Sequence, residues 1–112
     1  CFDVGHANIV GIDFERFITT IGSRLKVLHI HDNDGIYDLH QIPFTFTKTR
    51  ENLASTDWEG FLRGLGKIHL DGVLSFETAP VLSAFPEPMK QDVLAFIAGI
   101  GQYFRGEIQA AY

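Results

Sequence analysis

The chain has few cationic residues, one cysteine and no long apolar run. Its 9 lysines and arginines are scattered and are outnumbered by 14 acidic residues, which gives a net charge of −5. This balance argues against a nucleic-acid partner, because phosphate binding requires a basic surface. The apolar runs are also far shorter than the roughly 20 residues that a membrane helix needs. We therefore expect neither nucleic acid nor a membrane as a partner.

The single cysteine, Cys1, excludes an internal disulfide bond. This usage fits a reducing compartment, and we expect a cytoplasmic protein. The 112 residues suffice for one small domain, and 46% of them are hydrophobic, as in globular proteins. The sequence starts without methionine and with a strand pattern. We therefore expect the C-terminal part of a longer protein.

Three segments have the apolar periodicity of amphipathic helices. Residues 13–23 begin at Asp13, a suitable N-cap, and residues 57–66 follow Thr56, which opens a capping-box sequence. The third helix is expected from about residue 87 to 104. Their apolar stripes, which we expect to pack in a core, are Phe14, Phe17, Ile18 and Ile21, then Trp58, Phe61, Leu62 and Leu65, then Met89, Val93, Phe96, Ile97, Ile100 and Phe104.

Three apolar segments alternate with these helices and predict parallel strands with right-handed crossovers. They are residues 1–4, 26–32 and 72–77. Each has a possible metal ligand near its end, namely Asp3, His29 or Glu77, and in each strand this residue alternates with bulky apolar neighbours. The three side chains therefore face away from the covering helices. Because the carboxyl ends of parallel strands meet at one edge, we predict that they form one divalent-metal site there.

Residues 34–56 form a connection far longer than the usual loop of about 4–6 residues. It follows the second strand, where a long loop is commonly a lid or a substrate wall. In it, Asp38 and His40 stand two residues apart and share a side if the loop is extended. His6 follows Asp3 by three residues. We consider these three residues candidates for a substrate contact or a second metal ion, or else solvated loop residues.

Two further histidines receive other interpretations. His31 has the parity of His29 but lies nearer the strand exit, and the Asp32-Asn33-Asp34 sequence after it predicts a turn. His69 precedes the third predicted strand and hence lies at the opposite end of the sheet, so we expect it to be structural.

In their order and spacing, these motifs resemble the sugar phosphate isomerase/epimerase family, the xylose-isomerase-like (β/α)8 barrels that include the zinc-dependent apurinic endonucleases (AP endonuclease family 2). The matching sequences are Phe2–Asn8, Leu28–Gly35, Asp38-Leu39-His40, Asp57-Trp58 and Leu74–Glu77. The resemblance implies an α/β fold. Residues 1–112 would be the C-terminal part of a (β/α)8 TIM barrel, about three βα units with parallel strands, whose N-terminal units are missing.

The resemblance also implies residue roles. Asp3, His29 and Glu77 would be metal ligands from the last three strands, while the fourth usual ligand, a glutamate upstream, is absent. His6 matches a histidine that contacts substrate or an extra zinc ion. Asp38 and His40 match a pair that completes the endonuclease zinc cluster. The implied cofactor is one divalent metal ion, which could be Mn, Mg, Co or Zn.

The activity implied is isomerisation or epimerisation of a sugar or sugar phosphate. The ion would acidify a carbon-bound proton and stabilise the enediolate, and carboxylates would transfer the proton, with Glu77 as the catalytic candidate. One alternative is a zinc-dependent phosphodiesterase acting on damaged DNA, against which the acidic charge argues. Another is an inactive barrel fragment used for association. A partial barrel has open sheet edges, so we expect self-association or pairing with the missing half.

Overall fold

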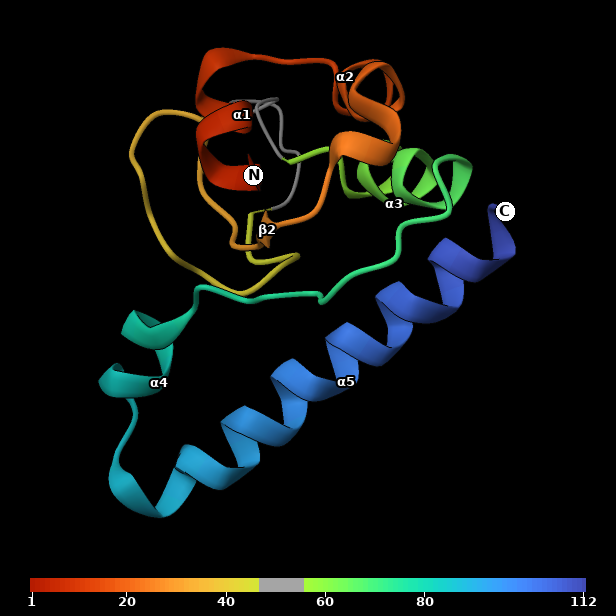
Figure 1. Ribbon diagram of the computed structural model, residues 1–112. Coiled ribbons are helices and arrows are strands. Elements are labelled where there is room, and N and C mark those ends of the chain that lie inside the picture. The colour runs from red at the N-terminus through yellow and green to blue at the C-terminus, as the bar shows by residue number, and fades with distance from the viewer. Residues whose placement is uncertain (47–55) are drawn as a thin grey trace.

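The computed structural model describes residues 1–46 and 56–112. Within these ranges the chain forms five α-helices, two short 3₁₀-helices and one two-stranded sheet (Figure 1). In chain order the elements are β1 (Phe2–Asp3), α1 (Val4–Val10), α2 (Phe14–Ile21), η1 (Gly22–Arg24), β2 (Leu28–His29), α3 (Trp58–Lys67), α4 (Ala79–Ala84), η2 (Glu87–Met89) and α5 (Lys90–Ala110). Of the predicted connection 34–56, residues 47–55 lie outside the described part. Among the described helices, none combines the length and the apolarity needed to cross a bilayer.

The predicted fold class, three βα units of a TIM barrel, is wrong. β1 and β2 do pair in parallel, with Phe2 opposite Leu28. Residues 72–77, however, make only one parallel bridge, between Phe76 and Ile30. In the described part of the chain the sheet therefore has two short strands, and most of the molecule is helical.

Local sequence explains why the strands are so short. The Asp3 side chain accepts a hydrogen bond from the His6 amide and caps α1, so the chain turns helical at Val4. Residues 72–77 gain no second neighbour from the described chain. Parallel strands are stable when buried between neighbours and helices, and a strand paired on one edge by one bridge does not extend.

The predicted helices are present, with shifted ends. Asp13 caps α2 as expected, accepting from the Arg16 amide at 3.1 Å. At α3 the cap is Asp57 and not Thr56, because the helix begins at Trp58 and the Asp57 side chain accepts from the Gly60 amide, while the Thr56 hydroxyl donates to the carboxylate of Asp32 at 2.6 Å. The third predicted helix comprises η2 and α5 and ends later, at Ala110. The helices α1 and α4 were not predicted.

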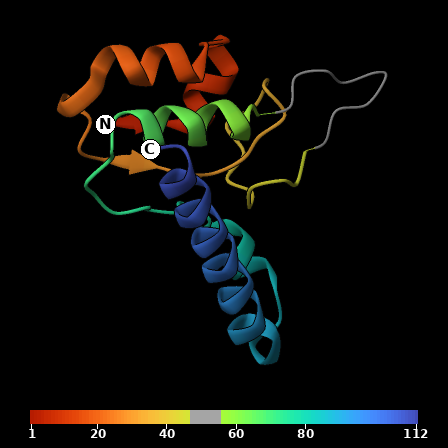
Figure 2. The same ribbon diagram turned by 90° about the vertical axis from the view of Figure 1, so that its right-hand side faces the viewer.

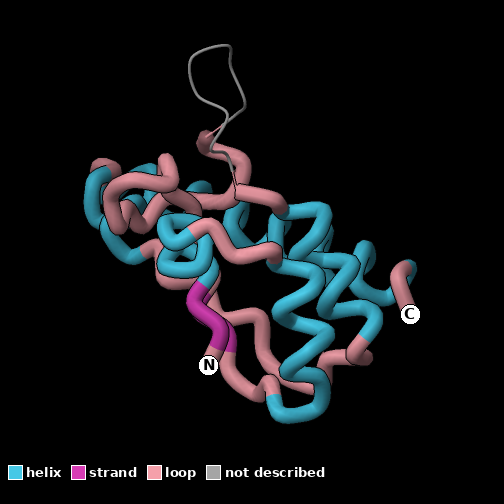
Figure 3. Tube along the Cα trace, turned by 90° about the horizontal axis from the view of Figure 1, so that it is seen from above, coloured by secondary structure: helices cyan, strands magenta, loops and turns pink. Residues whose placement is uncertain are grey.

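The stripe predicted on the last helix is correct only in part. Ile97, Ile100 and Phe104 are buried, whereas Met89 and Phe96 are exposed. Figures 1 and 2 show the reason: α4 and the first half of α5 extend away from the body formed by α1, α2 and α3. Figure 3 shows the chain starting at the strand and ending beyond α5.

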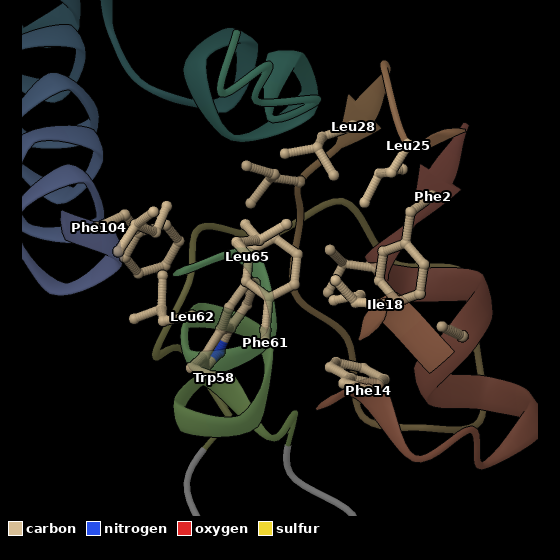
Figure 4. Packing of buried hydrophobic residues seen from close by; sticks show 14 of the residues in the cluster. Phe2, Phe14, Ile18, Leu25, Leu28, Trp58, Phe61, Leu62, Leu65 and Phe104 are labelled. Atoms are coloured by element: carbon tan, nitrogen blue, oxygen red, sulfur yellow. The ribbon is translucent and has the colours of Figure 1, made fainter. Parts of the chain in front are cut away.

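The core lies between α2, α3, the C-terminal half of α5 and one face of the sheet (Figure 4). Phe61 is fully buried at its centre. Its ring lies 5.7–6.5 Å, centroid to centroid, from four other aromatic rings, which are those of Phe2, Phe14, Trp58 and Phe104. This aromatic packing fixes the helices against the sheet.

The strand parity predicted from the sequence is confirmed. Phe2 and Leu28 are buried against the helices. His29 and Glu77, by contrast, keep more than a third of their side-chain surface exposed on the opposite side. The helices thus cover one face of the sheet, and the polar residues collect on the other face and at the strand ends.

Candidate metal centre

Four of the chain's five histidines gather with three carboxylates where β1, β2 and the bridging segment end. The histidines are His6, His29, His31 and His40, and the carboxylates are those of Asp3, Asp38 and Glu77. The paired strands and the bridging segment bring Asp3, His29, His31 and Glu77 together, α1 adds His6, and the 33–46 loop adds Asp38 and His40.

The three ligands predicted from the sequence do converge. His29 Nδ1 lies 3.2 Å from Glu77 Oε1 and 3.7 Å from Asp3 Oδ2. Asp3 is the most enclosed of the three, while His29 and Glu77 stand on the open side of the cluster. Parallel register accounts for this meeting, because Asp3 pairs directly with His29 in the sheet.

His31 lies at the centre of the cluster. It has no exposed surface, and its Nε2 is 3.4 Å from Asp3 Oδ1 while its Nδ1 is 3.5 Å from Glu77 Oε2. Neither ring nitrogen has a hydrogen-bond partner within the described chain. Burial lowers the pKa of His31 despite the neighbouring carboxylates. This direction of the pKa shift favours the neutral imidazole, which is the form that binds a metal ion.

Gly5 makes room for the His31 ring. A Cβ atom at this position would stand 2.1 Å from His31 Nε2 and 2.9 Å from Asn33 Nδ2. Asn33 in turn donates to the Gly5 carbonyl at 2.9 Å and accepts from Asn8 Nδ2 at 2.8 Å. These contacts tie the first turn of α1 to the chain after His31, so the place of the buried ring depends on a glycine.

The 33–46 loop adds Asp38 and His40. The His40 ring stacks on His31 with 4.1 Å between centroids and 19° between planes. His40 Nδ1 lies 3.0 Å from the Glu77 carbonyl oxygen, and since that oxygen can only accept, Nδ1 carries the hydrogen. In the neutral tautomer with hydrogen on Nδ1, the lone pair is on Nε2, which lies 3.6 Å from Asp38 Oδ1. A backbone carbonyl that orients an imidazole in this way is common for metal-binding histidines.

His6 is the most exposed member of the cluster. Its Nε2 lies 3.1 Å from Asp38 Oδ2, and this hydrogen bond, followed by the charge of Asp3, raises the pKa of His6. The pair of His6 and Asp38 forms the outer rim, where a ligand would first meet the protein.

The donor set fits a divalent cation. One ligand atom from each of Asp3, His31 and Glu77 lies within 4.8 Å of the others, and the same holds for His31, Asp38 and His40. Two ligands bound at about 2.1 Å to one ion stand at most about 4.2 Å apart, so small side-chain shifts would complete either group. Mixed oxygen and nitrogen donors suit Mn, Co and Zn. A cation would also give the buried His31 the partner that it lacks.

The other polar residues after β2 divide into two kinds. Asp34 forms the predicted turn, accepting from the amides of Ile36 and Tyr37 at 2.9 Å. Asp32 is more than a turn residue: it is fully buried, and burial raises its pKa although the Thr56 hydroxyl opposes that shift. His69 stacks on Tyr112 instead of joining the cluster.

Sequence reasoning chose His29 as the ligand, although His31 has the same parity and lies nearer the strand exit. In the structure β2 ends at His29, and His31 follows two residues later, fully buried. The shared parity was the signal for both histidines, whereas the burial of His31 depends on packing against Gly5, which is distant in the sequence.

Comparisons with known proteins leave the family open. No family model matches the chain, and no solved structure matches it. An uncharacterised protein of Sinorhizobium fredii, y4fM, is 30% identical over 78 residues, which make up 70% of this chain and 22% of that protein. The chain therefore spans about a fifth of the length of this curated relative.

Proposed function

We propose that the cluster binds a divalent metal ion and serves a sugar or sugar phosphate isomerase or epimerase. The observation that carries the metal site is His31: a fully buried imidazole with no hydrogen-bond partner in the described chain, between Asp3 and Glu77. Such a group is costly to bury, and a cation ligated by it removes that cost.

The position of each residue in the cluster suggests whether it would bind the ion, transfer a proton or bind a sugar hydroxyl group. Asp3, His31 and Glu77 would hold the ion, since their ligand atoms already lie together. When bound, a divalent cation supplies a Lewis acid that polarises the oxygens of an open-chain sugar. His29 and Glu77 face each other at 3.2 Å on the open side, where they can accept a proton from a sugar carbon and return it. His6 and Asp38 on the rim can bind hydroxyl groups.

Proton exchange with solvent tests this proposal directly. The protein is incubated with Mn²⁺ and open-chain aldoses or ketoses in D₂O, and deuterium entry beside the carbonyl is followed by ¹H NMR. We expect exchange that falls at least about 100-fold in Glu77→Gln. The matched control is Glu59→Gln, at an exposed position on α3. Wild-type exchange no faster than free Mn²⁺, or equal rates in both variants, would contradict the proposal.

The second ligand group supports one alternative. Asp38 and His40 share His31 with the first group, so the site has donors for more than one ion. Several zinc ions in one cluster would favour a phosphodiesterase. Two or three zinc ions per chain, together with hydrolysis of an aryl phosphodiester, would replace the isomerase proposal with this one.

A further inference from the structure

The Asp32 carboxylate is buried, and the hydrogen-bond donors that it has among residues 1–46 and 56–112 are neutral. Its Oδ1 accepts from the Asn33 amide at 2.9 Å and from the Thr56 hydroxyl at 2.6 Å, and its Oδ2 accepts from the Phe46 amide at 3.3 Å. Burying a carboxylate is costly even where hydrogen bonds offset part of the cost. Its burial beside the cluster therefore requires a reason.

The partners of Asp32 are far apart in the sequence. Its backbone forms an antiparallel bridge with Gln41, with N–H···O distances of 2.7 and 3.1 Å. One residue thus holds the chain at Gln41 through its backbone, and at Phe46 and Thr56 through its side chain. It also directly follows His31.

The bridge fixes the loop that completes the cluster. Residues 33–40 form the loop between Asp32 and its bridge partner Gln41, so His40 directly precedes the bridge. That position places the His40 ring on His31, and Asp38 lies two residues earlier, with Oδ1 3.6 Å from His31 Nε2. A shift of one residue at the bridge would turn both side chains away, since neighbouring residues in an extended segment face opposite sides.

We propose that Asp32 is a positioning residue of the metal site. Its backbone bridge to Gln41 returns Asp38 and His40 to the His31 ring, and its carboxylate, by binding the Phe46 amide and the Thr56 hydroxyl, holds the 33–46 loop in the register of that bridge. The inference rests on the proposed metal site and adds a determinant of its affinity. Asp32 itself does not contact the ion. Thr56, directly before the α3 cap Asp57, is the donor through which the Asp32 carboxylate is held to the start of α3.

The first test uses the protein without metal. The ring protons of His31 and His40 should show the shifts of stacked imidazoles by NMR. In Asp32→Ala we expect these shifts to move towards those of free histidine, while the signals of His69 stay unchanged. Asp13→Ala, which removes the cap of α2, is the control for a general loss of stability and should leave the stacked signals in place. Unchanged His31 and His40 signals in Asp32→Ala would overturn the inference.

The second test measures Mn²⁺ affinity by calorimetry. We expect Asp32→Ala to bind about 10- to 100-fold more weakly than wild type, with no change in Asp13→Ala. Asp32→Asn should lie between, because its amide oxygen can accept from Thr56 whereas its NH₂ group cannot accept from Phe46. Equal affinity in wild type and the Asp32 variants would overturn the inference.

A failure of folding and a failure of the proposed metal site can be told apart from a failure of this inference. If Asp32→Ala does not fold, Asp32→Asn and Thr56→Val take its place in both tests, with partial effects expected in the same direction. If wild type binds no metal, the proposed function fails, and the NMR comparison alone decides whether Asp32 positions the loop.

Discussion

Two fully buried rings, Phe61 and His31, belong to different kinds of interior. Phe61 is surrounded by four aromatic rings and has no polar atom to satisfy. His31 is just as inaccessible, but its two nitrogens face carboxylates without forming a hydrogen bond within the described chain. The first interior stabilises the fold, whereas the second leaves polar atoms unpaired within the described chain, at a cost in stability. The comparison teaches that burial alone does not identify the core.

The largest expected effect is on the aromatic interior. Phe61→Ala removes the ring at the centre of the core, and we expect a loss of about 3–5 kcal/mol in the free energy of unfolding, measured in urea. Phe96→Ala, at a position that is 61% exposed on α5, should change it by less than about 0.5 kcal/mol. Similar losses in the two variants would mean that the core does not centre on Phe61.

The next prediction concerns the room for His31. Gly5→Ala places a methyl group 2.1 Å from His31 Nε2, so the ring must move. We expect a loss of about 1–3 kcal/mol in unfolding free energy and displaced His31 signals by NMR. The control is Gly106→Ala on α5, where a Cβ meets nothing within 4 Å and the helix should gain about 0.5–1 kcal/mol. A Gly5→Ala protein as stable as wild type would show that His31 is not confined.

The cost of the unpaired imidazole can be measured directly. His31→Leu removes both orphaned nitrogens, so we expect the metal-free protein to gain about 1 kcal/mol in unfolding free energy. Thermal unfolding in the presence of a chelator measures this gain. A clear loss would indicate that His31 makes stabilising contacts, and the contrast with Phe61 would disappear.

Much of the helical part could be predicted, because it depends on local patterns. Asp13 and the apolar stripe after it define α2 within one turn of its observed length. α1 was missed because Asp3 does two things: it ends a strand and caps the helix that starts at Val4. Barrel strands were wrongly extended, since the pairing that limits a strand involves residues distant in sequence.

The part of the candidate site that depends on strand alternation could be predicted, whereas the part that depends on the fold of the 33–46 loop could not. Alternation places Asp3, His29 and Glu77 on one face, and parallel pairing brings them together there. The role of Asp32 could not be predicted, because it depends on Thr56, which is 24 residues away, and on a bridge to Gln41. Such contacts leave no periodic trace in the sequence.

The smallest expected effect is electrostatic and lies on the helical side. Glu15 on α2 accepts from Lys67 and Arg63 on α3, and these hydrogen bonds, that of Lys67 first, lower the pKa of Glu15. A lowered folded-state pKa gives stability that is complete above the unfolded value near 4.5 and is lost as the pH falls through the folded value. As the pH falls below 5, the free energy of unfolding should therefore decrease more in wild type than in Glu15→Gln. The difference should be small because the groups are exposed. Parallel pH profiles would contradict this.

The most direct test of the account is whether the cluster around His31 binds a divalent cation. Titration calorimetry with Mn²⁺ and Zn²⁺ compares wild type, His31→Leu and the control His69→Leu. The account predicts binding by wild type and by His69→Leu, and a loss of at least about 100-fold in affinity for His31→Leu. No binding by wild type, or equal affinity in His31→Leu, would contradict it.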